Sequence, residues 1–142
     1  MKNIIIFLSL CLSIYSVQAQ TVFGKWNTLN KETGKIESIV EVYRKDGKAY
    51  AKIIKLINES DKNNRCTACK GKNKNKPILG MIVFNGLKQG GNEWNGGKIL
   101  DPNNGKYYKC YISLANKNKL KIRGYVGISL LGRTDYWYRA KN

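Results

Sequence analysis

The sequence predicts an all-β protein, an eight-stranded antiparallel up-and-down β-barrel. Polar and apolar residues alternate with the period of two typical of a strand, and turn residues recur roughly every 8 to 14 positions. Beyond the first 20 residues, no window has the periodicity of an amphipathic helix. Strands joined in sequence favour a barrel because closure removes exposed sheet edges. A flattened two-sheet sandwich is the main alternative, and an outer-membrane barrel is disfavoured because Lys and Arg fall on both strand faces.

The strands are expected between turn signals, in chain order at 26–29, 36–44, 49–57, 78–85, 93–100, 107–114, 120–127 and 133–140. Asp46-Gly47 predicts a tight hairpin, because glycine supplies the positive φ that the turn requires. Asp101-Pro-Asn-Asn-Gly105 predicts a second reversal, in which the Asp101 carboxylate bonds backbone donors and Gly105 takes the left-handed position. Residues 58–77 are rich in Lys and Asn and predict a long loop.

The first 19 residues have the pattern of a cleaved signal peptide, which leaves a single domain over 20–142. Lys2 supplies a positive start, 4–17 is apolar, and Val-Gln-Ala19 fits a cleavage site. The apolar stretch is shorter than the roughly 20 residues of a membrane-spanning helix. We therefore expect an exported protein, periplasmic or secreted, that is not an integral membrane protein.

The chain is strongly basic, with 26 Lys and Arg against nine Asp and Glu and a formal net charge of +17. Removal of residues 1–19 would take one lysine and no acid, leaving a net charge of +16. Such a charge favours anionic partners, for example envelope lipids or glycans, although lysines that merely fill solvent-facing positions are the more ordinary cause. Export argues against nucleic acid as the partner.

Glycine-rich strands from Gly96 to Arg139, together with Gly24-Lys-Trp26 near the start, resemble the DUF2147 family of small secreted bacterial proteins. The resemblance implies a lipocalin-like barrel in which an arginine of the last strand lies across the first-strand indole. Gly24, Trp26 and Arg139 match that arrangement and would have a structural role, although Arg123 or Arg133 could take the arginine's place. The resemblance also implies a carrier or binding protein for a small, partly apolar molecule.

Three cysteines follow the signal segment. Cys66 and Cys69 are spaced as a redox motif or half a zinc site, and Cys110 is alone on a strand. A zinc site is disfavoured because the chain has no His. In an oxidising compartment a disulfide is expected, either between Cys66 and Cys69 or from one of them to Cys110. We predict the local bridge, with Cys110 free and buried, and no metal or cofactor.

Aromatic residues crowd the second half of the chain, and those facing inward could line a cavity. The predicted ligand-binding residues are Trp94, Tyr108, Ile112, Ile122, Tyr136 and Tyr138. A filled core is the equally weighted alternative. The lysine cluster at 70–76 could lie at the barrel mouth and attract an acidic head group.

The predicted function is therefore non-enzymatic: a carrier of a hydrophobic or amphiphilic ligand such as a fatty acid. Without His, the chain has no Ser-His or Cys-His pair for nucleophilic catalysis. The alternative is a basic envelope-interaction or adhesion protein without an internal ligand. An internal cavity would favour the carrier, whereas a packed interior with a concentrated basic face would favour the alternative.

Overall fold

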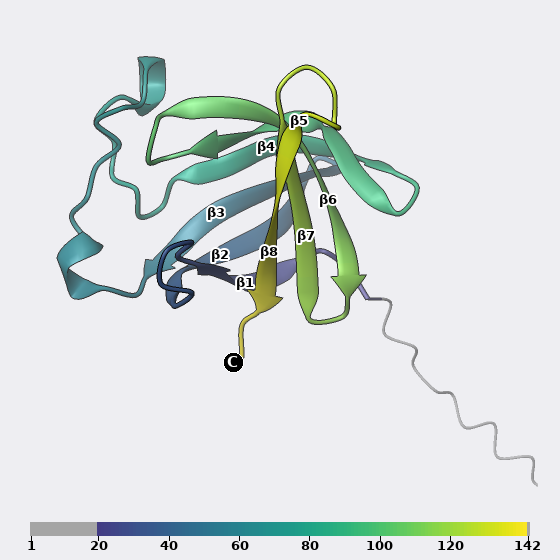
Figure 1. Ribbon diagram of the computed structural model, residues 1–142, viewed down its shortest axis with the longest axis horizontal. Coiled ribbons are helices and arrows are strands. Elements are labelled where there is room, and N and C mark those ends of the chain that lie inside the picture. Colours follow the sequence, from purple (N-terminus) through teal and green to yellow (C-terminus); the bar gives the residue numbers. More distant parts are fainter. Residues whose placement is uncertain (1–19, 142) are drawn as a thin grey trace, which may run out of the picture.

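The computed structural model describes residues 20–141, and the signal segment expected at 1–19 lies outside them. Eight strands form a closed antiparallel barrel in which each pairs with the next and the last with the first (Figure 1). The predicted fold class is confirmed. The strands are β1 (Gly24–Leu29), β2 (Ile36–Lys45), β3 (Lys48–Leu56), β4 (Ile82–Gly90), β5 (Glu93–Asp101), β6 (Lys106–Asn116), β7 (Lys119–Tyr125) and β8 (Gly132–Arg139).

Turn chemistry places the strand ends. The β2–β3 hairpin turns at Asp46 and Gly47, whose φ angles are 50° and 74°, as a tight primed turn requires. In the β5–β6 turn, the Asp101 carboxylate accepts the backbone N–H of Asn103 at 2.9 Å. The ring closes where Trp26 and Asn27 of β1 pair with Arg139 and Tyr138 of β8.

The up-and-down topology separates the connections into two sets. One set, here called the loop end, comprises residues 30–35, 57–81, 102–105 and 126–131. The opposite, N-terminal end holds the three tight turns and residues 20–23, at the start of β1. The longest connection, between β3 and β4, contains the short 3₁₀ turns η1 (Glu59–Asp61) and η2 (Gly71–Asn73) and extends to the left of the barrel in Figure 1.

The core lies inside the barrel and is built from inward-facing apolar residues of every strand. Its seventeen buried members are Val22, Trp26, Val40, Val42, Ala49, Ala51, Ile53, Leu56, Val83, Phe84, Leu87, Trp94, Cys110, Ile112, Leu120, Ile122 and Trp137. The rings of Phe84 and Trp137 stack with their centroids 6.0 Å apart. Two buried hydroxyls within it, of Thr28 and Ser38, bond each other at 2.6 Å.

The fourth strand is the least accurately predicted element, since 78–85 was expected and β4 spans Ile82–Gly90. Ile78 instead packs against both the core and the cysteine cluster of the long loop. β4 continues through Gly86, whose φ is 70°. The β5–β6 ladder is irregular between Trp94 and Gly97, and an added Cβ at Gly97 would lie 2.6 Å from a methyl of Leu87 in β4. Glycine therefore allows the two strands to pack closely at this bulge.

Candidate functional site

The barrel interior holds three of the predicted ligand-binding residues. Trp94, Ile112 and Ile122 are buried members of the core, packed among the other inward-facing side chains. Tyr108 lies nearer the loop end, half-buried, with its hydroxyl accepting the Asn104 amide at 3.0 Å. The interior of the described chain is thus filled chiefly by its own side chains, which corresponds to the packed alternative.

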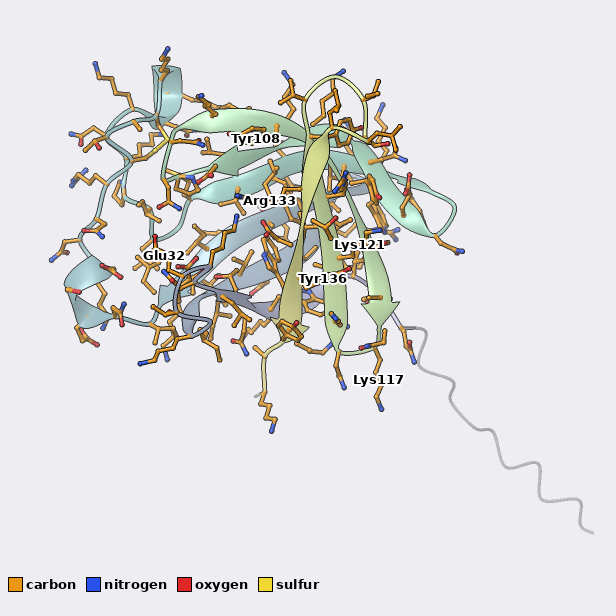
Figure 2. The ribbon with its side chains drawn as sticks, viewed as in Figure 1. Glu32, Tyr108, Lys117, Lys121, Arg133 and Tyr136 are labelled. Carbon is orange, nitrogen blue, oxygen red and sulfur yellow. A yellow bond between two sulfur atoms is a disulfide. The ribbon has the colours of Figure 1, made fainter. Side chains whose placement is uncertain are left out.

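Tyr136 and Tyr138 do not belong with this set. Both are 40 % exposed, and across the β7–β8 ladder Tyr136 pairs with Lys121 and Tyr138 with Lys119. Tyr136 and Lys121 are labelled on these two strands in Figure 2. The Lys119 ammonium lies 4.3 Å from the Tyr136 ring centroid. Trp137, between the two tyrosines, is the residue that faces inward. The expectation that Tyr136 and Tyr138 face a cavity is therefore wrong, because strand alternation gives them the opposite face from Trp137.

Trp94 lies near the N-terminal end under a cover of side chains. The Phe23 ring meets it edge to face at 5.3 Å between centroids. The Arg44 guanidinium lies 5.4 Å from the Phe23 centroid and 5.2 Å from the Trp94 centroid, over both rings. These contacts stabilise the covering of this end of the core.

Trp26 and Arg139 form the other cover at this end. Trp26 is fully buried and donates its indole N–H to the Val22 carbonyl at 2.9 Å. The Arg139 guanidinium lies 4.1 Å from the indole centroid and donates to the carbonyls of Lys117, Phe23 and Thr21. Burial lowers the pKa of Arg139 from its ordinary value, but guanidinium remains charged in proteins. Gly24 has a φ of 126° and leaves room for this guanidinium.

The predicted disulfide between Cys66 and Cys69 is confirmed, and it closes a short segment within the long β3–β4 connection. Cys66 and Cys69 are buried together with Met81 and Leu100, in a second small core separate from the barrel interior. The Cys66 N–H donates to the Lys76 carbonyl, and the Asn75 N–H donates to the Cys66 carbonyl, both at 2.9 Å. The loop therefore has a defined shape beside β4, β5 and β6.

A groove opens where this loop meets the barrel wall. It has a volume of about 350 Å³ and is lined by Lys72, Asn73, Lys76, Pro77, Leu79, Gly80, Met81, Ile82, Val83, Asn85 and Tyr107. Leu79 and Ile82 keep 40 % and 42 % of their surface exposed in it. Asn73 donates its amide to the Tyr107 hydroxyl at 2.6 Å, across the groove wall from loop to β6. We call this hollow the loop groove.

The lining of the loop groove is positively charged, because its two lysines form no ion pair with a carboxylate of the described residues. Within residues 20–141, the ion pairs join Lys31 and Arg133 to Asp135 and Lys62 to Glu59. Lys72 and Lys76 are exposed and take part in none of them. The groove lining thus combines apolar residues with two lysines, an arrangement suited to an amphiphilic anion.

A second hollow of about 650 Å³ lies at the N-terminal end, lined by Phe23, Gly24, Lys25, Glu41, Val42, Tyr43, Arg44, Arg139 and Ala140. Its lining includes Glu41, a carboxylate, and Arg139, whose donors already bond carbonyls. It is therefore the weaker candidate for an anionic ligand.

Cys110 is buried and free, as predicted, and burial raises the pKa of its thiol to about 12. The thiol therefore stays protonated near neutral pH and is a poor nucleophile there. Across the described residues, no group of three His, Cys, Asp or Glu side chains could hold a metal ion. No helix among residues 20–141 is long and apolar enough to cross a membrane.

Sequence reasoning missed the loop groove and the Arg44 cover. The only groove signal was the lysine cluster at 70–76, which was expected at the barrel mouth and instead lies beside the outer wall, with Lys72 and Lys76 in the groove lining. The inward-facing residues of β8 could have been predicted. Arg139 and Trp137 lie on the same face of the strand, so the expected contact between Arg139 and Trp26 implies that Trp137 also faces inward.

Residues 24–139 match the family model DUF2147, described as uncharacterized proteins conserved in bacteria. Among solved structures, the chain is similar to protein HP1028 from the human pathogen Helicobacter pylori, described as belonging to the lipocalin family. The two are 23 % identical and superpose with a TM-score of 0.76 over 87 % of this chain and 86 % of the other. No curated protein matches the sequence.

Proposed function

The chain belongs to the DUF2147 family of bacterial proteins and folds as a lipocalin-like barrel, and from this premise we propose that it binds a small amphiphilic molecule. The ligand class is an apolar chain with an acidic head, such as a fatty acid. The proposed site is the loop groove, and the proposed role is that of an exported, non-enzymatic carrier in the periplasm or outside the cell. The disulfide supports export, since such bonds persist in oxidising compartments.

The observation that carries the proposal is the chemistry of the groove lining. Leu79 and Ile82 remain partly exposed, and Pro77, Lys72 and Lys76 line the same groove. Its volume of about 350 Å³ lies within the range of small-molecule sites. Covering each methylene of a ligand contributes about 0.8 kcal/mol, so a chain of about ten would support micromolar binding after ordering costs.

A ligand site in the loop groove is also compatible with a barrel whose interior is filled by side chains. Trp94, Ile112 and Ile122 are packed in the core, so a ligand that reached them would first have to displace other side chains. Ligand binding at the loop groove needs no such displacement. The interior residues therefore support the fold under this proposal, and Tyr108 lies near the loop end rather than at the groove.

The test is titration of the folded protein, residues 20–142 with the disulfide intact, with medium- and long-chain fatty acids by calorimetry. The double variant Lys72→Ala/Lys76→Ala should bind at least about tenfold more weakly, a change of about 1.4 kcal/mol. Lys88→Ala/Lys117→Ala is the matched control, because it removes the same charge from exposed lysines away from the groove and should leave affinity unchanged.

Amide chemical shifts then decide between groove and interior. Saturation with decanoate should shift Leu79, Ile82 and Tyr107 and leave Ile112 and Ile122 in place. Shifts concentrated on the two core isoleucines would return the site to the barrel interior. Failure of all fatty acids to bind up to their solubility would reject the carrier proposal in favour of the envelope-interaction alternative.

A further inference from the structure

The connection between β7 and β8 exposes an unusual amount of apolar surface. Val126, Ile128, Leu130 and Leu131 are 66 %, 58 %, 82 % and 67 % exposed. Figure 1 shows this loop standing clear of the barrel wall at the top of the view. Single exposed apolar residues are ordinary, but four on one short loop indicate a surface that contacts something apolar. We call residues 126–131 the apolar tip.

The apolar tip is held in an outward-facing form. Arg123 donates to the carbonyls of Ser129 and Leu130 and to the Thr134 hydroxyl. The Leu131 N–H donates to the Ile128 carbonyl at 3.0 Å. With its backbone carbonyls bonded in this way, the loop projects its apolar side chains rather than folding them onto the barrel. The ordering cost of a contact made by these side chains is accordingly reduced.

Cationic residues flank the apolar tip in the sequence and follow from its base across the sheet. Arg123 and Arg133 bound an uncharged run at 124–132. At its base, Tyr125 of β7 pairs with Lys109 of β6, and Lys109 pairs with Lys98 of β5. Two lysines therefore continue the cross-strand row that begins at the base of the tip. The loop-end connections together carry eight Lys and Arg against three Asp and Glu, so this end as a whole attracts anions.

We propose that the apolar tip docks the protein on the surface of an anionic lipid bilayer. The four apolar side chains would enter the interface, while Arg133, Lys109 and Lys98 contact acidic head groups. Shallow apolar insertion combined with basic residues is the chemistry of peripheral membrane binding. One short loop offers far less surface than the roughly 800 Å² per partner of a standard protein interface, which favours lipid over a second copy or another protein.

Vesicle flotation tests the proposal with residues 20–142, disulfide intact. Vesicles of phosphatidylcholine with roughly one third phosphatidylglycerol should bind the protein, and pure phosphatidylcholine should bind it weakly. Leu130→Ser/Leu131→Ser should weaken binding about tenfold or more. Ile57→Ser is the matched control, an exposed apolar residue outside the tip, and should bind as the parent protein does. Raising salt from about 0.1 M to about 1 M should weaken binding, because screening shortens the reach of the cations.

A fluorescence measurement locates the contact directly. Trp26, Trp94 and Trp137 are all buried, so a tryptophan introduced by Leu130→Trp reports on the tip. Its emission should shift to the blue on anionic vesicles and be quenched by brominated acyl chains. Unchanged emission, equal binding by the Leu130→Ser/Leu131→Ser variant, or absence of vesicle binding would each overturn the proposal. A tip-dependent dimer in sedimentation velocity without vesicle binding would assign the tip to a second copy instead.

Discussion

Gly105 of the β5–β6 turn lies directly against the backbone of Ala68, between the two bridged cysteines. An added Cβ at Gly105 would overlap the Ala68 carbonyl and lie 2.7 Å from the Cys69 nitrogen. Its φ of 70° is also a conformation that other residues rarely adopt. Gly105 therefore has two structural roles, because it forms the turn and allows the backbone of the disulfide loop to pack directly against it.

Gly105→Ala should be strongly destabilising. The positive φ alone costs about 1–2 kcal/mol for a residue with a Cβ, and the overlap with Ala68 adds to it. Gly47→Ala is the control, since Gly47 has a φ of 74° with no atom near its added Cβ. Urea unfolding should give a loss in the free energy of unfolding clearly larger for Gly105→Ala than for Gly47→Ala. Equal losses would show that the disulfide loop moves readily away from position 105 to accommodate the added methyl group.

Removal of the disulfide should loosen the loop more than the barrel. A bridge closing so few residues contributes about 2 kcal/mol by chain entropy, and the barrel core makes no use of it. In Cys66→Ser/Cys69→Ser, hydrogen exchange of the Cys66-position and Asn75 amides should accelerate, while the Ile112 and Leu120 amides keep their protection. Uniform acceleration at all four would mean that loop and barrel unfold as one unit.

Replacing Trp26 with Ala should cost about 3–5 kcal/mol in the free energy of unfolding, as for a fully buried aromatic residue. Arg139→Lys should cost about 1–3 kcal/mol, because an ammonium cannot reproduce the planar donors that reach three carbonyls. Arg133→Lys, a largely exposed arginine, should change stability by less than about 0.5 kcal/mol. A loss below about 1 kcal/mol for Trp26→Ala would contradict the role of the indole as the floor of the core.

Cys110 should make the free energy of unfolding depend on pH in the alkaline range. Its folded pKa of about 12 lies above the unfolded value near 8.5, so the unfolded chain loses its proton first. Its contribution to stability should be constant below about pH 8 and then fall by up to about 1.4 kcal/mol per pH unit between about pH 9 and about pH 12. The difference between the parent protein and Cys110→Ala in urea unfolding isolates this thiol from lysine and tyrosine titration. Native Cys110 should also resist alkylation at pH 8, and rapid labelling of the folded protein would contradict its burial.

Strand number, order and most boundaries were predictable because alternation and turn residues act locally. β4 was misplaced because Ile78 is apolar like a strand residue, yet packs beneath the disulfide, a contact that no local pattern reports. Tyr136, Trp137 and Tyr138 form an unbroken aromatic run, so alternation alone could not say which face turns inward. The loop groove depends on how residues 72–82 return to the wall beside Tyr107, which is a tertiary relationship.

Hydrogen bonds join the first residues of the barrel domain to its last strand. The Arg139 guanidinium donates to the carbonyls of Thr21 and Phe23, and the Ala140 N–H donates to the Lys25 carbonyl. Thr21 and Ala140 therefore lie at the same end of the barrel. Attachment to a sensor chip, bead or fusion partner through either terminus would orient every molecule alike, with the loop groove and the 126–131 connection turned toward the bulk solution. Immobilisation through surface lysines would randomise that orientation, so the two chemistries form a built-in comparison for binding measurements.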